Sequence, residues 1–305
     1  MKLLSPRPMK AKHVAALANQ YRVTDGRNFR LADCDPADTW ELESKEQAAG
    51  LLEKGVAKLA ALQDTLYAQD KWAVLLIFQA MDAAGKDSTI KHVMSGVNPQ
   101  GCQVFSFKAP NAQELDHDFL WRTNLCLPER GRIGIFNRSY YEETLVVRVH
   151  PEFLRGQKLS EKLITKDIWK ERFEDINAYE RYLSRNGVVI RKFFLHVSKE
   201  EQRRRFLARL DEKEKNWKFS AADLKERALW DKYQHAYGET IRHTSSAHAP
   251  WHVIPADHKW FTRLAVSAVV IETLESLQLA YPKLTEAQAR ELAGVREALL
   301  AEKKA

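Results

Sequence analysis

The chain has 305 residues, enough to bury a full hydrophobic core, and its 45% hydrophobic and 29% charged residues are typical of a folded globular protein. Lys and Arg outnumber Asp and Glu by 48 to 41, and the net charge of +7 favours polyanionic partners, whether nucleic acid, acidic membrane or inorganic polyanion. Three widely spaced cysteines argue against a disulfide framework. There is no signal-peptide pattern and no apolar run long enough to span a membrane, so we expect a cytoplasmic protein.

The first segment, residues 1–70, is predicted to hold an extension and a helix. Up to about residue 45, polar and apolar residues mix without clear periodicity, so we expect this part to lie over the surface of the main domain. From Ser44 onward, leucines and valines recur at three- and four-residue steps, which predicts a long helix.

The core is predicted to occupy residues 71–280, where short apolar runs alternate with helical patterns. Such alternation is typical of βαβ units, whose ligands bind at the carboxyl ends of the strands. Strands are expected at 73–78, 103–107, 133–136, 188–197 and 252–254. Helices are expected at 86–97, 112–127, 161–186 and 258–278. The predicted fold is α/β, a three-layer α/β/α sandwich with a parallel five-stranded sheet.

A change of pattern at about residues 198–248 predicts a helical lid within this core, because the helices there are rich in charge. Ser220 and Asp223 stand three residues apart before an apolar residue, which is close to a capping-box start. We expect the helix that begins there to run to about Tyr237.

The final segment, residues 281–305, is predicted to form a C-terminal helix. Thr285 is followed three residues later by Gln288, which is the capping-box pattern. We expect this helix to serve packing or assembly, and the protein to form a homo-oligomer.

The strongest chemical signal is Gly85-Lys86, directly after the first buried strand and before a helical pattern. In a P-loop, backbone N–H groups and a helix N-terminus surround phosphate oxygens while a lysine neutralises their charge. The match is imperfect, because Ala80 replaces the first glycine of the pattern and Asp87 replaces its Ser or Thr. The context nevertheless predicts a P-loop NTPase or kinase fold, with an ordinary strand–helix turn as the alternative. The candidate phosphate-binding residues of the loop are Ala83, Ala84, Gly85, Lys86, Asp87 and Ser88.

Two carboxylates, Asp82 and Asp87, stand beside this loop, where they would repel phosphate unless a cation intervened. Hard oxygen ligands suit Mg²⁺, which keeps several waters and bridges phosphates. The loop therefore predicts Mg²⁺, with Mn²⁺ as the second choice. The alternative is that Asp87 only favours the helix dipole.

Two further polar segments are candidate parts of the site. Asn137 and Arg138 follow the strand at 133–136, where they could hold metal or nucleotide; the alternative is a strand followed by a helix cap. Arg205 and Arg209 share one face of a helix at the start of the lid, with Lys213, Lys215 and Lys218 nearby. Cations there could close over a transferring phosphoryl group, although charge runs are more often solvated faces.

Together these segments resemble polyphosphate kinase family 2, over about residues 46–280. The first four motifs are A-M-D-A-A-G-K-D at 80–87, S-F-K-A-P at 106–110, H-D-F-L-W-R at 117–122 and F-N-R-S-Y-Y-E-E at 136–143. The next four are E-E-Q-R-R-R-F at 200–206, N-W-K-F-S at 216–220, W-D-K-Y at 230–233 and P-W-H-V-I-P-A-D-H-K-W at 250–260. The resemblance implies a P-loop fold, a lid over a basic channel for polyphosphate, Mg²⁺, and direct phosphoryl transfer between polyphosphate and AMP, ADP or ATP.

The resemblance also implies roles for individual residues. The expected catalytic residues are Asp82, Lys86, Arg138 and Arg205, and the expected metal ligands are Asp82, Asp87 and Asn137. Lys108, Arg122, Glu142 and Arg209 fall in family motifs and are expected to bind phosphate or nucleotide.

Two positions depart from the family pattern. Many members have glycine at the position of Ala80 and aspartate at that of Asn137. The N-R-S form resembles the subgroup that phosphorylates both AMP and ADP, and guanine nucleotides are further candidate acceptors. An amide binds Mg²⁺ more weakly than a carboxylate does, which is our hypothesis for why both acceptors would be admitted.

Three other functions stay open at this point. A P-loop kinase that uses ATP on a small metabolite would share the fold, the metal and Lys86. A non-catalytic nucleic-acid-binding module would use the positive charge, but the aromatic platforms expected for strand stacking are not evident, so no nucleic acid is expected as a partner. A phosphohistidine enzyme would use His92, His117 or His150, none of which stands in a recognisable nucleophile context.

Overall fold

The computed structural model describes residues 11–40, 42, 44–212, 214 and 221–302. Its centre is a six-stranded sheet in the order β1-β6-β5-β2-β4-β3. The strands are β1 Arg22–Val23, β2 Ala73–Gln79, β3 Cys102–Ser106, β4 Ile133–Asn137, β5 Val188–His196 and β6 Trp251–Pro255. The pairs β3–β4, β4–β2, β2–β5 and β5–β6 are all parallel, which confirms the five predicted strands. β1 is an addition that the sequence did not predict, and it pairs antiparallel with β6.

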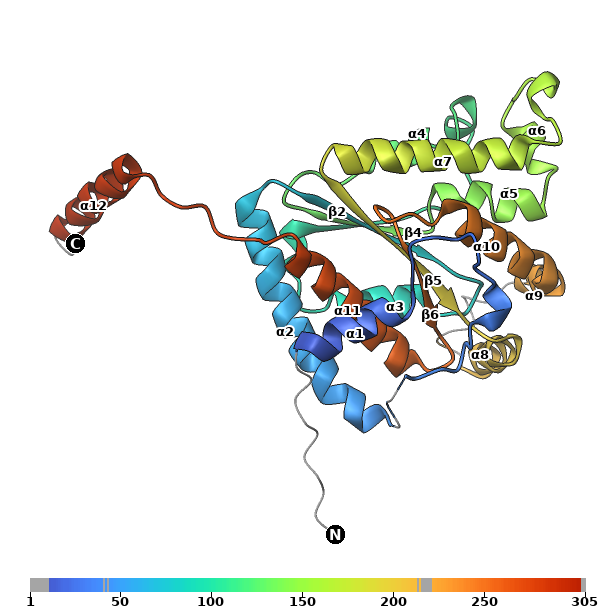
Figure 1. Cartoon of the computed structure of the whole chain (residues 1–305), viewed down its shortest axis with the longest axis horizontal. Coiled ribbons are helices and arrows are strands. Elements are labelled where there is room, and N and C mark those ends of the chain that lie inside the picture. The colour runs from blue at the N-terminus through green and yellow to red at the C-terminus, as the bar shows by residue number, and fades with distance from the viewer. Residues whose placement is uncertain (1–10, 41, 43, 213, 215–220, 303–305) are drawn as a thin grey trace, which may run out of the picture.

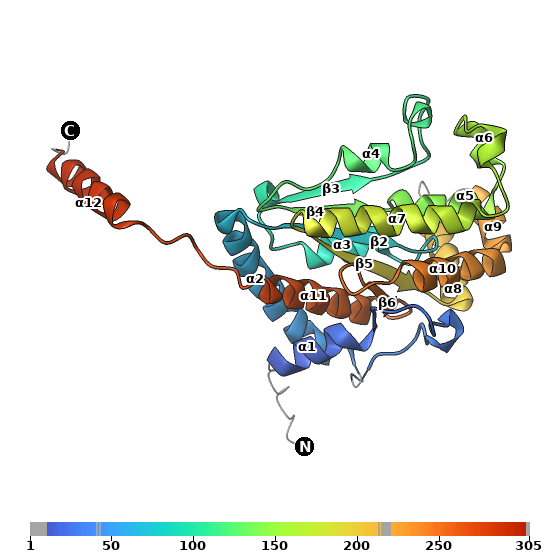
Figure 2. The same cartoon turned by 45° about the horizontal axis from the view of Figure 1, so that its top comes forward.

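Helices cover both faces of the sheet, as the three-layer prediction requires (Figure 1). One face carries α1 Ala11–Gln20, α2 Lys45–Gln69, α3 Lys86–Val93 and α11 Lys259–Ser276. The other face carries α5 Val146–Val149, α7 Ile168–Arg185 and α10 Trp230–Thr244. The remaining helices are α4 Trp121–Asn124, α6 Phe153–Gly156, α8 Lys199–Asp211, α9 Ala221–Ala228 and α12 Glu286–Ala301. Helices α8 and α9 lie at the carboxyl ends of the strands, and α12 stands apart at the opposite end (Figures 1 and 2).

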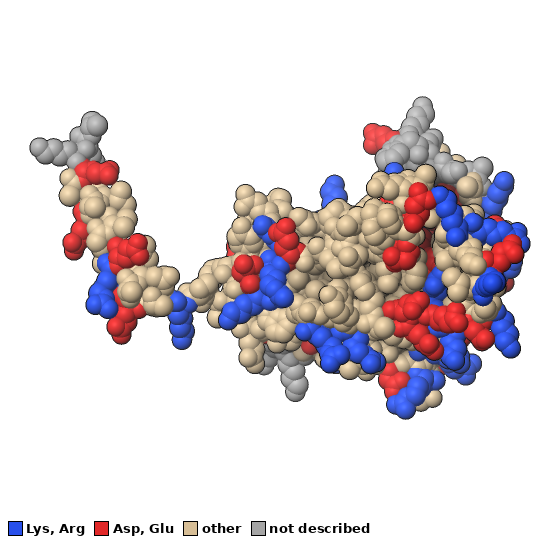
Figure 3. Space-filling model, turned by 90° about the horizontal axis from the view of Figure 1, so that it is seen from above, with Lys and Arg blue, Asp and Glu red and all other residues tan. Residues whose placement is uncertain are grey.

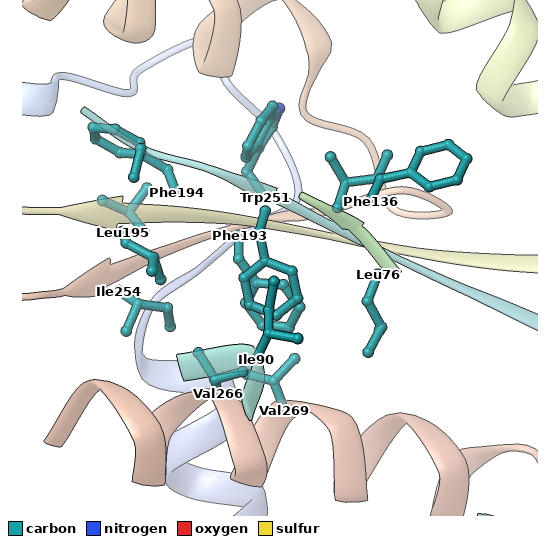
Figure 4. Packing of buried hydrophobic residues seen from close by; sticks show 14 of the residues in the cluster. Leu76, Ile90, Phe136, Phe193, Phe194, Leu195, Trp251, Ile254, Val266 and Val269 are labelled. Atoms are coloured by element: carbon teal, nitrogen blue, oxygen red, sulfur yellow. The ribbon is translucent and has the colours of Figure 1, made fainter. Parts of the chain in front are cut away.

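The core consists of apolar side chains that alternate between the two faces of the sheet. Every residue of β2 is buried, because helices cover it on both sides. Phe193 and Ile254 point toward Val266 and Val269 of α11, whereas Phe194 and its neighbours on the other strands point to the opposite face (Figure 4). This alternation follows from the two-residue period of a strand and fixes the register of each strand against the helices.

The prediction of a surface extension was wrong for residues 11–23, whereas residues 1–10 lie outside the described part of the chain. α1 packs against α11, and Leu17 is fully buried in the core. The register Arg22↔His252 then adds β1 to the sheet. The short helix offers too few turns for its apolar stripe to stand out as a periodic pattern, so only the packing reveals it.

The predicted helix at 112–127 was also wrong. Only the short 3₁₀ turn Glu114–Asp116 and α4 form there. The Asn111 side chain accepts from the Glu114 amide at 2.9 Å, and the Glu114 carboxylate accepts from the Asn111 amide at 2.8 Å. Such local side-chain bonds offer the backbone an alternative to helix, which explains the break.

The lid segment consists of two parts. The predicted helix from Ser220 to Tyr237 is split into α9 and α10, and Ser220 itself lies outside the described residues. α10 buries Trp230, Tyr233 and Ile241 in the main core, so the chain from residue 230 onward belongs to a layer of the sandwich. Only α8 and α9 are left over the carboxyl ends of the strands.

The remaining global predictions concern thiols and the membrane. Cys34, Cys102 and Cys126 are all free, as expected for a chain without a disulfide framework. In the part of the chain that the structure describes, no helix is long and apolar enough to cross a bilayer.

Candidate active site

The loop between β2 and α3 presents the amino end of a helix to the carboxyl edge of the sheet. Gly85 caps α3 with φ 105°, a conformation in which other residues are strained. A Cβ there would also come within 3.3 Å of the Ser88 hydroxyl oxygen. Ala83, with φ 61°, adds a second left-handed residue to the loop. The result is a tight turn whose amides open at the start of α3, the arrangement that binds anions.

Lys86 lies across this turn. Its Nζ donates a hydrogen bond to the carbonyl oxygen of Ala80 at 2.8 Å, so the ammonium group spans the loop. Burial, helped by the nearby positive charge of Arg138, lowers the pKa of Lys86 to about 8, although Asp82, Glu142 and Asp87 oppose the shift. A partly desolvated ammonium group inside an anion-binding turn gains strongly when a phosphate joins it.

The turn after β4 meets the phosphate loop because β4 pairs with β2 in register Phe78↔Asn137. Asn137 Nδ2 donates to Asp87 Oδ1 at 2.7 Å, and Arg138 Nη2 lies 3.3 Å from Asp82 Oδ1. Arg138 has φ 64°, an uncommon value for a non-glycine residue, and its amide donates to the Phe78 carbonyl at 3.0 Å. The two sequence segments thus form one polar cluster.

Glu142 completes the cluster. Its Oε2 lies 3.7 Å from Arg138 Nη1. Burial raises the pKa of the Glu142 carboxyl, an effect that the positive charges of Arg138 and Lys86 oppose. Arg138 therefore lies between two carboxylates, Asp82 and Glu142, which hold its guanidinium group in place.

A cavity of about 870 Å³ opens over this cluster; we call it the loop cavity. Its cationic lining is Lys86, Lys108, Arg138, Arg204, Arg205, Arg209 and Lys259, and its acidic lining is Asp82, Asp87, Glu212 and Asp223. Predicted residues from four separate segments are thus brought together. Lys259, Arg204, Glu212 and Asp223 were not predicted individually as site residues, although Lys259 and Arg204 fall inside quoted family motifs.

Charged side chains gather around this end of the molecule. Figure 3 shows Lys, Arg, Asp and Glu intermixed at the end opposite α12, where the carboxyl ends of the strands and the lid helices lie. Lys213, Lys215 and Lys218 lie outside the described residues.

Arg205 lines the loop cavity, but the protein itself accepts all of its hydrogen bonds. Its Nη1 donates to the carbonyls of Ala83 and Ala84, its Nη2 to those of Ala256 and Asp257, and its Nε to Glu201, at 2.6–3.1 Å. The side chain is only 5% exposed. Arg205 therefore stabilises the phosphate loop through hydrogen bonds to the loop backbone.

Gln202, a turn earlier on α8, supports the loop in the same way. Its Nε2 donates to the Asp82 carbonyl at 2.9 Å, and its Oε1 accepts from Arg227 Nη1 of α9 at 2.9 Å. The two lid helices are therefore attached to the phosphate loop through one buried amide.

The other predicted binding residues lie around the same region. Ser88 lines the loop cavity, although its hydroxyl donates to the Gly85 carbonyl at 3.0 Å. Lys108 is exposed in the cavity mouth. Arg122 lies behind it, where it donates to the Lys108 carbonyl at 2.7 Å and lies 3.6 Å from Glu114. Arg122 therefore orients the loop that carries Lys108.

A second cavity, of about 390 Å³, adjoins the first; we call it the side cavity. Its apolar walls include Phe119, Val146 and Phe153, none of which was predicted. Phe119 falls inside a quoted family motif, whereas nothing in the local sequence marks Val146 and Phe153, which come from the consecutive helices α5 and α6. The side cavity shares Lys108, Ala109 and Arg138 with the loop cavity, so the two cavities adjoin at these residues.

The donor set suits a hard cation. Asp82 and Asp87 both line the loop cavity and supply carboxylate oxygens. Among the described residues, no group of three or more His, Cys, Asp and Glu forms a cage for a metal ion. A cation that keeps most of its waters and binds through one or two carboxylates plus substrate phosphates, as Mg²⁺ does, fits these residues. The Asn137 amide orients Asp87 through its N–H group.

None of the three histidines considered as nucleophiles is among the residues that line the loop cavity. His117 stacks on Trp121 at a centroid distance of 4.0 Å in the wall of the side cavity. His150 is bonded to Glu152 and Glu226, at 3.2 and 3.0 Å. Neither His150 nor His92 is among the residues that line the two cavities.

Comparison with known proteins gives a consistent picture. The family model "Polyphosphate kinase 2 (PPK2)" matches residues 42–282. An ADP-polyphosphate phosphotransferase of Rhodopseudomonas palustris is 55% identical over 92% of this chain and 98% of the relative. An AMP/ADP-polyphosphate phosphotransferase of Meiothermus ruber is 46% identical over 87% of this chain and 95% of the relative. The crystal structure of polyphosphate kinase 2 from Arthrobacter aurescens TC1 is 40% identical, covers 92% of this chain and 96% of its own, and has a TM-score of 0.84.

Proposed function

The chain belongs to the polyphosphate kinase 2 family, and on that premise we propose that it transfers phosphoryl groups between inorganic polyphosphate and the nucleotides AMP and ADP. Both similar relatives are named for ADP as a substrate, and one is also named for AMP. The observation that carries the proposal is the junction of the two cavities at Lys108 and Arg138, beside the phosphate loop.

Each cavity suits one substrate. The loop cavity, at about 870 Å³, is large enough and cationic enough for a chain of phosphates, with basic residues from the loop, α8 and α11. The side cavity has apolar walls that fit a nucleoside, and its shared mouth admits the nucleotide's phosphates to the loop. Donor and acceptor phosphates then meet between Lys86 and Arg138.

The reaction proceeds in line. A terminal oxygen of the nucleotide phosphate forms a bond to the last phosphorus of the polymer, and the bond from that phosphorus to the next bridging oxygen breaks. The shortened polymer leaves as an anion, and no proton has to be removed because the attacking oxygen is already ionised near neutral pH. Catalysis therefore depends on positioning and charge neutralisation by the loop amides, Lys86 and Arg138.

We also propose that Mg²⁺ takes part, with Mn²⁺ as a substitute. Asp82 and Asp87 would hold it, and when bound it would neutralise phosphate charge that these carboxylates otherwise repel. Asn137 contributes by fixing Asp87. Chelation by EDTA is expected to abolish turnover, and added Mg²⁺ to restore it.

Product analysis tests the function. AMP, ADP or GDP is incubated with long-chain polyphosphate and Mg²⁺ without any other phosphoryl donor, and the nucleotides are separated by chromatography. We expect ADP from AMP and ATP from ADP; guanine nucleotides are proposed as further acceptors, because apolar walls can hold any purine. No product from any acceptor would refute the function. Activity on small metabolites with ATP alone would favour the metabolite-kinase alternative instead.

We propose further that the protein is cytoplasmic and forms a homo-oligomer through α12. The free thiols of Cys34, Cys102 and Cys126 suit a reducing compartment. Leu292, Val295 and Leu299 are exposed on α12, and a lone helix of this length is marginal in water.

Light scattering on the full chain tests the assembly. Leu292→Glu/Val295→Glu is expected to give a smaller particle than the wild type, whereas Glu291→Gln on the same helix leaves it unchanged. A monomeric wild type at high concentration would contradict the proposal.

A further inference from the structure

A buried ionic network lies directly behind the turn that carries Arg138. Lys192 of β5 and Glu180 of α7 are both fully buried, and Lys192 Nζ donates to Glu180 Oε2 at 2.6 Å. The ammonium group also donates to the Tyr141 hydroxyl at 2.9 Å and to the Thr244 carbonyl at 2.7 Å. All three protons of the ammonium group are therefore used.

The carboxylate side of the pair reaches the same turn. Glu180 Oε1 accepts from the hydroxyls of Tyr140 and Tyr141, at 2.9 and 2.7 Å. Both tyrosines are buried and begin the 3₁₀ turn Tyr140–Glu143. Burial, reinforced by the charge of Glu180, keeps the pKa of each tyrosine well above its usual value, so both stay protonated as donors.

This turn connects the network to the reacting groups. It follows Arg138 after one residue, Ser139, whose hydroxyl oxygen accepts from Gln79 at 3.1 Å and from the Tyr141 amide at 3.1 Å. The turn also carries Glu142, which lies 3.7 Å from Arg138 and lines the side cavity. A shift of the two tyrosines would therefore move Arg138 and Glu142 together.

Stability alone does not account for an ion pair in this place. Desolvation of two charges costs several kcal/mol, and an apolar pair of similar volume is often as stable or more stable. The ion pair instead fixes the geometry of the turn, because each hydrogen bond to a tyrosine hydroxyl holds the turn at one position. The left-handed backbone of Arg138 needs such support, since it is a strained conformation for a residue with a side chain.

We propose that Lys192 and Glu180 are positioning residues for phosphoryl transfer: through Tyr140 and Tyr141 they hold the turn that places Arg138 and Glu142 beside the phosphate loop. The inference rests on the proposed function and deepens it. Lys192 and Glu180 line neither cavity. In this proposal they nevertheless set the positions of Arg138 and Glu142, which lie beside the transferring phosphoryl group.

The test is a kinetic cycle on the full-length protein. Lys192→Met/Glu180→Leu removes both charges together, so that neither is left buried alone. We expect it to keep its fold, with the same circular dichroism spectrum and a similar melting temperature. We expect kcat for ADP phosphorylation to fall by about 10²-fold, because a misplacement near 1 Å has that effect. The KM for polyphosphate should change little, since Arg138 is one of several cations in the loop cavity and the others stay in place.

Combining the apolar pair with Arg138→Ala and comparing kcat distinguishes a positioning role of Lys192 and Glu180 from a role in packing alone. If the pair acts through Arg138, adding Arg138→Ala to the apolar pair lowers kcat no further than Arg138→Ala alone does. Losses that multiply would overturn the proposal, and so would a folded apolar pair with the kcat of the wild type. If the apolar pair fails to fold, Tyr140→Phe decides. It removes one hydroxyl without changing shape, and a kcat equal to that of the wild type would overturn the proposal.

Two controls complete the design. Arg191→Met alters the neighbouring residue on β5, whose Nε donates to Thr273 at 3.0 Å away from the turn, and should leave kcat unchanged. The wild type is assayed with polyphosphate in parallel. An inactive wild type would refute the proposed function, whereas an active wild type with an equally active, folded apolar pair would refute only the positioning role.

Discussion

An arginine at a phosphate site can either contact the phosphate or support the backbone of the phosphate loop, and a variant of Arg205 can distinguish the two roles. If Arg205 contacted polyphosphate, its loss would weaken binding of the polyanion. In the structure its guanidinium group instead donates to four backbone carbonyls, those of Ala83, Ala84, Ala256 and Asp257, and pairs with Glu201 at 2.6 Å. Arg205→Gln should therefore act on the shape of the phosphate loop and leave the count of phosphate contacts unchanged.

The expected magnitudes follow from this burial. Removing one partner of a buried charged pair costs about 3–5 kcal/mol of unfolding free energy, so Arg205→Gln should melt at a clearly lower temperature. At a temperature where the variant is folded, kcat should fall by about 10²-fold because the loop amides are misplaced.

Polyphosphate binding over a series of salt concentrations is the deciding assay. By analogy with other polyanions, the logarithmic salt slope reports the number of cations in contact with the chain. Arg205→Gln should keep the wild-type slope, whereas Arg209→Gln, in the same helix and the same cavity, should reduce it by about 1. A shallower slope for Arg205→Gln with an unchanged melting temperature would refute the reasoning.

Three further predictions concern single side chains. The pKa of Lys86 is lowered to about 8 from its ordinary 10.5, so the unfolded chain binds the extra proton between these values and unfolding free energy should rise with pH there. For the same reason kcat/KM should fall above about pH 8 as the ammonium group is lost, and a falling limb that persists in Lys86→Arg would contradict this. Asn137→Asp would set two carboxylates face to face at Asp87, so Mg²⁺ should bind more tightly, activity should need less of it, and the ratio of AMP to ADP turnover should shift; an unchanged ratio would defeat the acceptor hypothesis. Phe153→Ala should raise the KM for ADP about tenfold through lost packing while sparing the KM for polyphosphate, and equal effects on both would argue against a nucleoside in the side cavity.

The sequence predicted the site residues that directly follow a buried strand in the chain. Gly85 and Lys86 stand after a buried apolar strand, and Asn137 and Arg138 stand after another, so the carboxyl ends of parallel strands brought them together as expected. Family motifs then added Lys108, which lies with Arg138 at the junction of the two cavities.

The remaining features of the site depend on long-range contacts that no local sequence pattern predicts. Three consecutive arginines begin the lid, yet only Arg205 turns inward while Arg203 and Arg204 remain exposed. Helical periodicity predicts which residues share a face of the helix. It does not predict which of these arginines donates hydrogen bonds to the carbonyls of the phosphate loop. Phe119, in a turn, and Phe153, in the short helix α6, share the side cavity although they are far apart in sequence. An apolar residue in so short an element looks like ordinary packing until the fold is known.

The most direct measurement is the initial rate of ATP formation from ADP, polyphosphate and Mg²⁺ by the wild type, Lys86→Ala and Lys91→Ala. Lys91 lies exposed on the same helix and serves as the matched control. We predict that Lys86→Ala keeps its fold but loses about 10²–10³ in turnover, while Lys91→Ala retains the rate of the wild type. A folded Lys86→Ala enzyme with nearly full turnover would contradict the claim that this ammonium group holds the transferring phosphates.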